Sequence, residues 1–119
     1  MLQPNTYLIM QLKDTQDPTS DNAVKVFKTS KELKEIGFEP DAADYEPVYS
    51  GKIEYPDDDL MWIVNDIYCE INLLTPDDYV GRTIDVSDVL ALNLNGEVRA
   101  FYIEDAGYTE LDGFLPEYQ

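Results

Sequence analysis

Residues 89–103 read VLALNLNGEVRAFYI and carry the strongest folding signal in the chain. The apolar runs 89–94 and 98–103 are rich in residues that favour β-strands, and Asn95-Gly96 lies between them. An Asn-Gly pair suits a tight turn, because both positions accept positive φ angles. The segment therefore predicts a β-hairpin, and residues 108–111 follow closely enough to add a short third strand.

Strand signals in the first half of the chain are weaker. Residues 7–12 predict a strand, and residues 23–28 alternate apolar and basic side chains as a half-buried strand does. We expect these two segments to be able to pair across the polar loop 14–22. Residues 45–53 look extended, and Pro47 should keep them at an edge of the sheet because proline has no backbone N–H.

The best helix signal lies in residues 58–71, where Leu60, Ile63 or Val64, Ile67 and Ile71 recur at helical spacing. The three aspartates 57–59 come just before it. Carboxylates at that place cap free N–H groups and favour the positive end of the helix dipole, so these residues have an ordinary structural role.

A shorter helix is predicted over residues 30–36. Ser30 is the expected cap, Leu33 and Ile36 are expected to face inward, and Gly37 is the expected stop signal. Residues 41–44, DAAD, suggest one further helical turn.

The pattern as a whole predicts one α+β domain over residues 1–115, with residues 116–119 as a frayed tail. We expect a small antiparallel sheet, open or barrel-like, that contains the hairpin and packs against the two helices. The chain has 119 residues, of which 44% are hydrophobic and 12% aromatic, and this composition favours folding over disorder.

Acidic residues outnumber basic residues by 25 to 8, there is no histidine, and the formal net charge is −17. Residues 1–53 hold nine acidic and six basic residues, a net charge of −3, whereas residues 54–119 hold sixteen and two, a net charge of −14. Such a surface repels nucleic acid, anionic membranes and phosphorylated substrates, and it attracts basic proteins and cations. A solvated acidic surface that only maintains solubility is the alternative.

The polarised charge predicts an acidic face that binds a basic partner. Because duplex DNA carries about one charge per 1.7 Å of its axis, such a face could approach the charge density of DNA. The residues predicted to form it are Asp57, Asp58, Asp59, Asp66, Glu70, Asp77, Asp78, Glu104, Asp105, Glu110 and Asp112. Tyrosines next to acids, among them Tyr45, Tyr49, Tyr55, Tyr79 and Tyr118, either contribute to a partner face or close the edge of the core.

No catalytic residue, metal site or cofactor is predicted. A nucleophilic Ser87 would need a base and the chain has no histidine, so Ser87-Asp88 is read as a turn motif. The acidic runs 57–59 and 77–78 lack the ligand order of a calcium loop, and weak divalent-ion binding is the most we expect. Cys69 is the single cysteine, so no internal disulfide can form, and we interpret it as a packing residue.

The N-terminal region has no basic segment, and its apolar run 7–12 is too short for a signal peptide or a membrane span. Together with the single cysteine, this predicts a soluble cytoplasmic protein.

Four blocks of the sequence carry a family resemblance: DAADYEPVYSGKI (41–53), DIYCEIN (66–72), GRTIDVSDVLAL (81–92) and AFYIEDAGYTEL (100–111), followed by GFL. Without one of the two alanines in the first block, these blocks and the order of the elements resemble the YodL-like domain over about residues 7–115. The resemblance rests on Tyr45, Glu46, Val48, Tyr49, Asp66, Ile67, Tyr68, Gly81, Val86, Ser87, Asp88, Val89, Tyr102, Gly107, Tyr108 and Leu111.

The resemblance implies a non-enzymatic domain of bacterial conjugative elements, plasmids and phages, often one module of a larger polypeptide. Where such domains commonly read GHSLSVSDV and DHP, this chain has GRTIDVSDV with Arg82, and Leu74-Thr75-Pro76. These departures remove the histidines, so no role of those histidines is carried over.

Small acidic proteins of such elements often block host defence systems, including restriction enzymes and CRISPR nucleases. We therefore predict an inhibitor of the anti-CRISPR or anti-restriction type, a DNA mimic that occupies the basic nucleic-acid channel of a bacterial host nuclease. The alternative is a structural or protein-interaction module of conjugation or replication machinery. A divalent-ion-dependent hydrolase is the least favoured reading.

Overall fold

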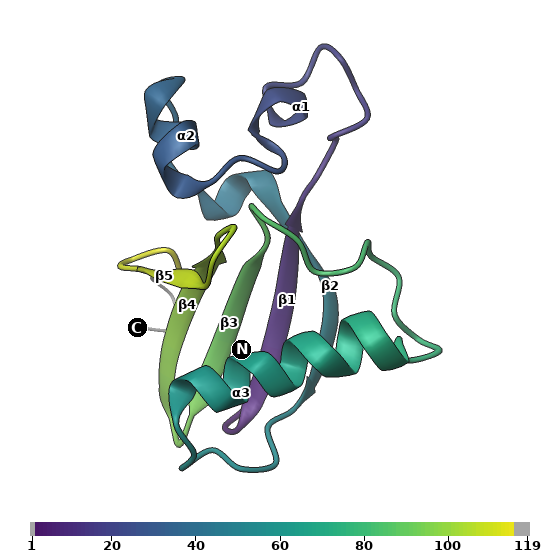
Figure 1. Cartoon of the computed structure of the whole chain (residues 1–119), viewed down its shortest axis with the longest axis vertical. Helices are drawn as coiled ribbons and strands as arrows, with labels where there is room; N and C mark the ends of the chain where they lie inside the picture. The colour runs from purple at the N-terminus through teal and green to yellow at the C-terminus, as the bar shows by residue number, and fades with distance from the viewer. Residues whose placement is uncertain (1, 116–119) are drawn as a thin grey trace.

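The structure is a computed structural model and describes residues 2–115. Five antiparallel strands form one sheet in the order β2-β1-β3-β4-β5 (Figure 1). The strands are β1 (Thr6–Leu12), β2 (Tyr45–Lys52), β3 (Val89–Leu94), β4 (Glu97–Ile103) and β5 (Tyr108–Leu111). Within the described residues β2 and β5 do not pair, so the sheet is open rather than barrel-like. The tail predicted at residues 116–119 lies outside the described part of the chain.

The predicted hairpin is confirmed as β3 and β4. Leu94 pairs with Glu97, and the two residues between them have φ angles of 54° at Asn95 and 97° at Gly96. Positive φ at both positions lets the turn follow the right-handed twist of the strands. The short third strand is confirmed as β5, which pairs with β4.

Strand β1 lies inside the sheet, between β2 and β3. Because β2 and β3 both run antiparallel to β1, they are parallel to each other, and their connection crosses one face of the sheet. Strand β2 is an edge strand, as predicted from Pro47, and the register between β1 and β2 shifts between Ile9 and Met10. A proline and a bulge both suit an edge, where one side of the strand has no ladder to complete.

The strand predicted over residues 23–28 is wrong. This segment begins with a short helix, α1 (Asn22–Lys25), whose buried side chains are polar. The Asn22 amide donates to the Lys13 carbonyl oxygen at 2.8 Å, and Lys25 Nζ lies 3.1 Å from Asp44 Oδ2. Asn22 and Lys25 are three residues apart, which is helical spacing, and β1 already has a neighbour on each side.

Helix α2 (Ser30–Glu35) is confirmed, but its cap is Thr29 instead of Ser30. The Thr29 side chain accepts from the Glu32 backbone N–H, and the Glu32 carboxylate accepts from the Thr29 backbone N–H, which makes a capping box. Leu33 is buried as expected, whereas Ile36 lies at the end of the helix and is 45% exposed. The predicted turn at DAAD is confirmed as η1 (Ala42–Asp44).

The long predicted helix is confirmed as α3 (Leu60–Cys69), which continues into a π-helical turn, η2 (Glu70–Leu74). Asp59 caps α3, because its Oδ1 accepts from the Met61 backbone N–H at 3.3 Å. Figure 1 shows α3 lying across one face of the sheet, with α1 and α2 at one end of the strands.

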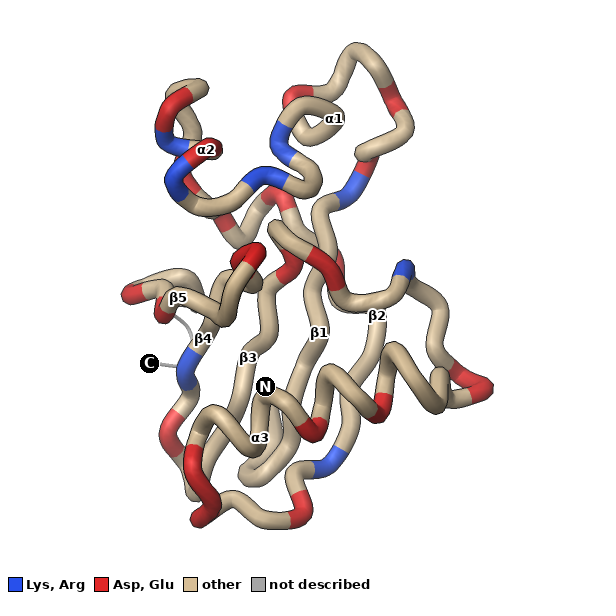
Figure 2. The backbone as a smooth tube through the Cα atoms, viewed as in Figure 1, with Lys and Arg blue, Asp and Glu red and all other residues tan. Residues whose placement is uncertain are grey.

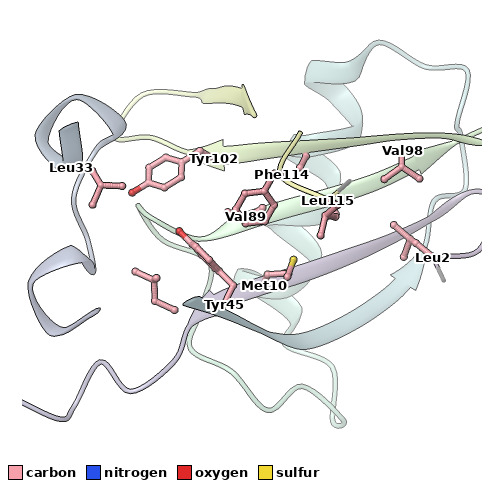
Figure 3. Packing of buried hydrophobic residues seen from close by; sticks show 12 residues of the cluster. Leu2, Met10, Leu33, Tyr45, Val89, Val98, Tyr102, Phe114 and Leu115 are labelled. Carbon is pink, nitrogen blue, oxygen red and sulfur yellow. The ribbon is translucent and has the colours of Figure 1, made fainter. Parts of the chain in front are cut away.

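Both faces of the sheet are covered, which explains why β3 is buried along almost its whole length. On one face Ile9, Leu90 and Phe101 pack against Ile63 and Ile67 of α3. The other face carries a second apolar cluster, shown in Figure 3, which includes residues of α2 and of the segment after β5. Its members are Leu2, Met10, Leu12, Leu33, Tyr45, Val89, Ala91, Val98, Ala100, Tyr102, Phe114 and Leu115.

Candidate functional site: an acidic and apolar surface around α3

The longest stretch of one-sign charge surrounds α3. Residues 53–81 contain eight acidic residues and no lysine or arginine, and all eight acidic side chains are exposed. They are Glu54, Asp57, Asp58, Asp59, Asp66, Glu70, Asp77 and Asp78. Figure 2 shows acidic positions before, along and after α3, whereas lysines gather around α1 and α2. We call the exposed side chains of residues 54–80 the α3 surface.

The α3 surface is also unusually apolar. Ten large hydrophobic residues in the described part of the chain are exposed, and seven of them lie between residues 55 and 80. These seven are Tyr55, Met61, Trp62, Tyr68, Leu73, Leu74 and Val80. Because α3 buries Ile63, Val64 and Ile67 against the sheet and still exposes Met61 and Trp62, it is apolar on more than its inner face.

Glu70 and Asp78 meet at a group of three tyrosines. The Tyr7 hydroxyl donates to Glu70 Oε2 at 3.5 Å, and the Tyr49 ring lies 6.2 Å from that of Tyr7 and 5.6 Å from that of Tyr79. Burial and then the charge of Glu70 raise the pKa of Tyr7, and burial and then the charge of Asp78 raise the pKa of Tyr49. These phenols stay protonated, so they serve as hydrogen-bond donors to the acids.

Glu104 and Asp105 lie on the other flank of α3, where they line a hollow together with Met61 and Tyr68. Glu104 is half-buried and accepts hydrogen bonds from the Ser30 backbone N–H at 2.8 Å, the Ser30 hydroxyl and the Thr109 hydroxyl. Burial opposes its charge, but these hydrogen bonds outweigh burial and lower the pKa of Glu104. This acid therefore attaches the start of α2 to the sheet.

Glu110 and Asp112 are placed apart from the other predicted acids. They line a separate hollow with Arg99, near the β3–β4 turn. Both Glu110 oxygens accept from the Arg99 guanidinium, at 2.8 and 3.1 Å, so this charge is largely neutralised. The structure thus gathers nine of the eleven predicted acids around α3 and its flank and leaves two elsewhere.

Other residues singled out in the sequence are placed differently. Cys69 is exposed on α3, so its interpretation as a packing residue is wrong. Among the tyrosines considered for a partner face, Tyr55 is exposed, Tyr49 and Tyr79 are half-buried, and Tyr45 is buried. Tyr118 lies outside the described residues.

Sequence reasoning missed the apolar part of the α3 surface. The available signal was the density of apolar residues in LMWIV and INLL, which exceeds one stripe of a helix. The residues missed are Met61, Trp62, Tyr68, Leu73, Leu74 and Val80.

Ser87 and Asp88 are buried and have structural contacts. The Ser87 hydroxyl oxygen accepts from the Phe27 backbone N–H at 3.0 Å, and the Ser87 carbonyl oxygen accepts from the Tyr45 hydroxyl at 2.6 Å. Asp88 Oδ2 accepts from the Asp85 backbone N–H at 2.9 Å, as a turn motif predicts. The bond to Phe27 was not expected, since these two residues are far apart in the sequence.

Asp88 belongs to a polar cluster that joins β1 to the loop before β3. The Gln11 amide donates to Asp88 Oδ2 at 3.0 Å and to the Arg82 carbonyl oxygen at 2.9 Å, and Gln11 Oε1 accepts from the Arg82 backbone N–H at 3.0 Å. Arg82 Nη1 lies 3.6 Å from Asp88 Oδ1. A Cβ atom on Gly81 would lie 2.6 Å from Gln11 Oε1, so only glycine fits there without displacing this cluster.

In the described residues, no group of three acidic or cysteine side chains is arranged to hold a metal ion. Across that same part of the chain, no helix has the length and apolar character needed to cross a membrane.

Several residues behind the family resemblance thus have positions that the fold requires. Asp88 belongs to the polar cluster, and Gly81 lies against its Gln11 side chain. Ser87 binds the Phe27 backbone N–H, Tyr45 binds the Ser87 carbonyl, and the Tyr102 hydroxyl donates to the Lys28 carbonyl at 2.7 Å. No curated protein and no solved structure matches the chain significantly. Residues 6–114 match the family described as the YodL-like domain, which covers nearly the whole chain, and the protein therefore belongs to the YodL-like domain family.

Proposed function

We propose that this protein is a non-catalytic, cytoplasmic binding protein of a bacterial mobile genetic element, and that its α3 surface docks on a basic protein. The leading target is the nucleic-acid channel of a host defence nuclease, which the protein would occupy as an inhibitor of the anti-CRISPR or anti-restriction type. The single observation that carries the proposal is the coincidence of eight exposed acids and seven exposed large apolar residues between residues 54 and 80.

Charge supports a basic partner. The α3 surface carries eight negative charges with no lysine or arginine among them, and opposite fields speed association. Most of these acids are also available for a partner. In the described residues only three ion pairs form, and none of the three uses an acid of the α3 surface.

The apolar residues support a protein partner over a purely electrostatic role. A surface that serves solubility alone needs charge but gains nothing from exposed Trp62, Met61 or Leu74. The buried centres of protein interfaces are enriched in aromatic residues and methionine. We therefore expect binding with two components, a salt-sensitive association rate and a slower, apolar-dependent dissociation.

The test is capture of partners from a bacterial host lysate at low and at high salt. The charge variant is Asp58→Lys with Asp77→Lys, since both side chains are exposed and make no hydrogen bond or ion pair with any residue between 2 and 115. The matched control is Glu35→Lys with Glu39→Lys, two exposed acids with the same charge change near α2. We expect the α3 variant to slow association about tenfold and the control to have little effect.

The capture experiment also separates the two candidate targets. Recovery of a nuclease or another nucleic-acid-binding protein supports the inhibitor, and its cleavage assay then measures inhibition. Recovery of conjugation or replication proteins favours the alternative of an interaction module. If the α3 variant and the control variant bind the captured partner equally well, the acids of the α3 surface have no role in binding either kind of partner.

A further inference from the structure

One groove on the α3 surface combines apolar and acidic lining residues. It has a volume of about 570 Å³ and lies between the second half of α3 and the segment that follows β2. Buried Ile63 and Ile67 line it, and the exposed residues Tyr55, Leu73 and Leu74 line it as well, with exposed fractions of 66%, 77% and 78%. Apolar side chains thus form both its floor and part of its rim.

The π-helical turn η2 affects the direction of the Leu74 side chain. With regular α-helical spacing, Leu74 would follow Ile67 and Ile71 on the buried face of the helix. In η2 the Thr75 backbone N–H donates to the Glu70 carbonyl oxygen, five residues back, at 3.1 Å, and also to the Ile71 carbonyl oxygen, four residues back, at 3.2 Å. This wider turn advances each side chain by a smaller angle, so Leu74 is directed outward.

The groove is acidic as well as apolar. Glu54, Asp66 and Glu70 line it, against one basic residue, Lys52. A partner that fills this groove therefore needs apolar side chains for its floor and basic side chains for its rim. From Ile63 to Leu74 the lining follows the helix axis for roughly 16 Å, which is about three turns of a helix laid alongside.

We propose that this groove binds a basic amphipathic helix of the partner protein. The inference rests on the proposed function and deepens it, because it assigns the apolar contact to one groove and the partner's contact to one element. Two or three apolar residues at helical spacing would lie against Ile63, Ile67 and Leu74, and lysines or arginines on the flanks would pair with Asp66 and Glu70.

Other occupants suit the groove less well. A second copy of this chain also carries a net charge of −17, so the two copies would repel each other. An anionic lipid headgroup would be repelled by the acids of the groove for the same reason. An extended strand added to β2 would meet Pro47 and the bulge beside Met10, which interrupt the edge.

The probe is a synthetic helical peptide that repeats leucine and lysine at helical spacing. A peptide with serine for leucine keeps the charge, and a peptide with glutamate for lysine keeps the apolar stripe. We expect the Leu/Lys peptide to bind and both controls to bind at least about tenfold more weakly. By NMR, binding should shift the amide resonances of Ile53, Tyr55, Ile67 and Leu74, and not those of Met61 and Tyr108 on the opposite flank.

Two variants test the groove directly. Leu74→Ser and Asp66→Lys both change exposed side chains, and each should weaken peptide binding about tenfold. The matched controls Ile36→Ser and Glu35→Lys change exposed residues near α2 and should bind as wild type. Circular dichroism checks that every variant is folded.

Equal binding of the Leu/Lys and Ser/Lys peptides, or resonance shifts on the opposite flank, would overturn the proposal. The proposal would also be overturned if sedimentation showed a dimer that Leu74→Ser dissociates, because a second copy of the chain would then occupy the groove. Failure here is distinguishable from failure of the proposed function. If the peptide does not bind but the captured partner still depends on Asp58 and Asp77, only the groove is refuted. If the peptide binds but no basic protein is captured, only the proposed function is refuted.

Discussion

Burial of Asp88 predicts that mild acidification stabilises this protein. The Asp88 residue is 1% exposed, and its carboxylate lies among the donors of Gln11 and Asp85, with Arg82 at 3.6 Å. Burial penalises the charged form more than these partners favour it, and the pKa of Asp88 rises from 3.8 to about 6. Folding therefore binds a proton in the window between these two values.

The sign follows from proton linkage. Between pH 3.8 and about 6 the folded state holds more protons than the unfolded state, so the Asp88 contribution to stability falls as pH rises through this window. A shift of about two pKa units corresponds to roughly 3 kcal/mol in total. Roughly 1 kcal/mol of it would be lost between about pH 5 and about pH 7, where the folded carboxyl titrates.

The assay is urea unfolding at about pH 5 and about pH 7 with constant ionic strength. Asp88→Asn cannot titrate, so the drop in the free energy of unfolding from about pH 5 to about pH 7 should be smaller for this variant by roughly 1 kcal/mol. Four carboxyl groups with lowered pKa values act in the opposite direction in both proteins, so they cancel in the comparison; these are Asp17, Glu32, Glu104 and Glu110. If wild type and variant show the same pH dependence, the reasoning is refuted.

Two further predictions concern stability. Gly81→Ala should lower the free energy of unfolding by urea by about 2 kcal/mol, because the new Cβ would lie 2.6 Å from Gln11 Oε1 and 2.9 Å from Val48 Cβ. A loss below about 0.5 kcal/mol would mean that the protein has room for a methyl group at position 81. Salt should raise the melting temperature by several degrees between low and physiological ionic strength, because it screens repulsion among the exposed acids. A melting temperature that does not change with salt would contradict this account.

Local chemistry made some of the fold predictable. The Asn95-Gly96 turn could be predicted because both residues of this turn have positive φ angles, which few residue types other than Asn, Asp and Gly adopt. The cap of α3 at Asp59 followed from the same kind of local rule. No local rule predicted the neighbours of β1, because its partners β2 and β3 lie far along the chain. The pattern of residues 7–12 indicates a strand, but it does not indicate which strands pair with it.

The errors have physical causes. Residues 23–28 alternate as a strand does, but hydrogen bonds from Asn22 and the ion pair of Lys25 with Asp44 stabilise a short helix there. The exposure of Leu74 was not predicted: its spacing matches the buried residues of α3, but it lies in the π turn η2, where each residue advances by a smaller angle. A search for helical periodicity assumes the same rotation per residue along the whole helix, so it cannot detect a change from an α-helical to a π-helical turn.

The candidate site was predictable in its charge and not in its geometry. A count of acids indicated that the second half of the chain is strongly negative, and most of those acids do surround α3. That Glu110 is paired with Arg99, and that Glu104 holds the start of α2, depends on strand pairings that composition does not encode.

The central position of β1 has a consequence for synthesis on the ribosome. Synthesis runs from N- to C-terminus, so β1 is made before the other four strands of the sheet, yet its Tyr7 pairs with Leu92 of β3, 85 residues later. Until β3 has emerged, the inner edge of β1 has unpaired backbone groups and its apolar side chains have no finished core. Folding must therefore wait for most of the chain, and contacts this distant slow it further. The nascent protein is most prone to aggregation during this interval, which ends when the β3–β4 hairpin pairs with β1.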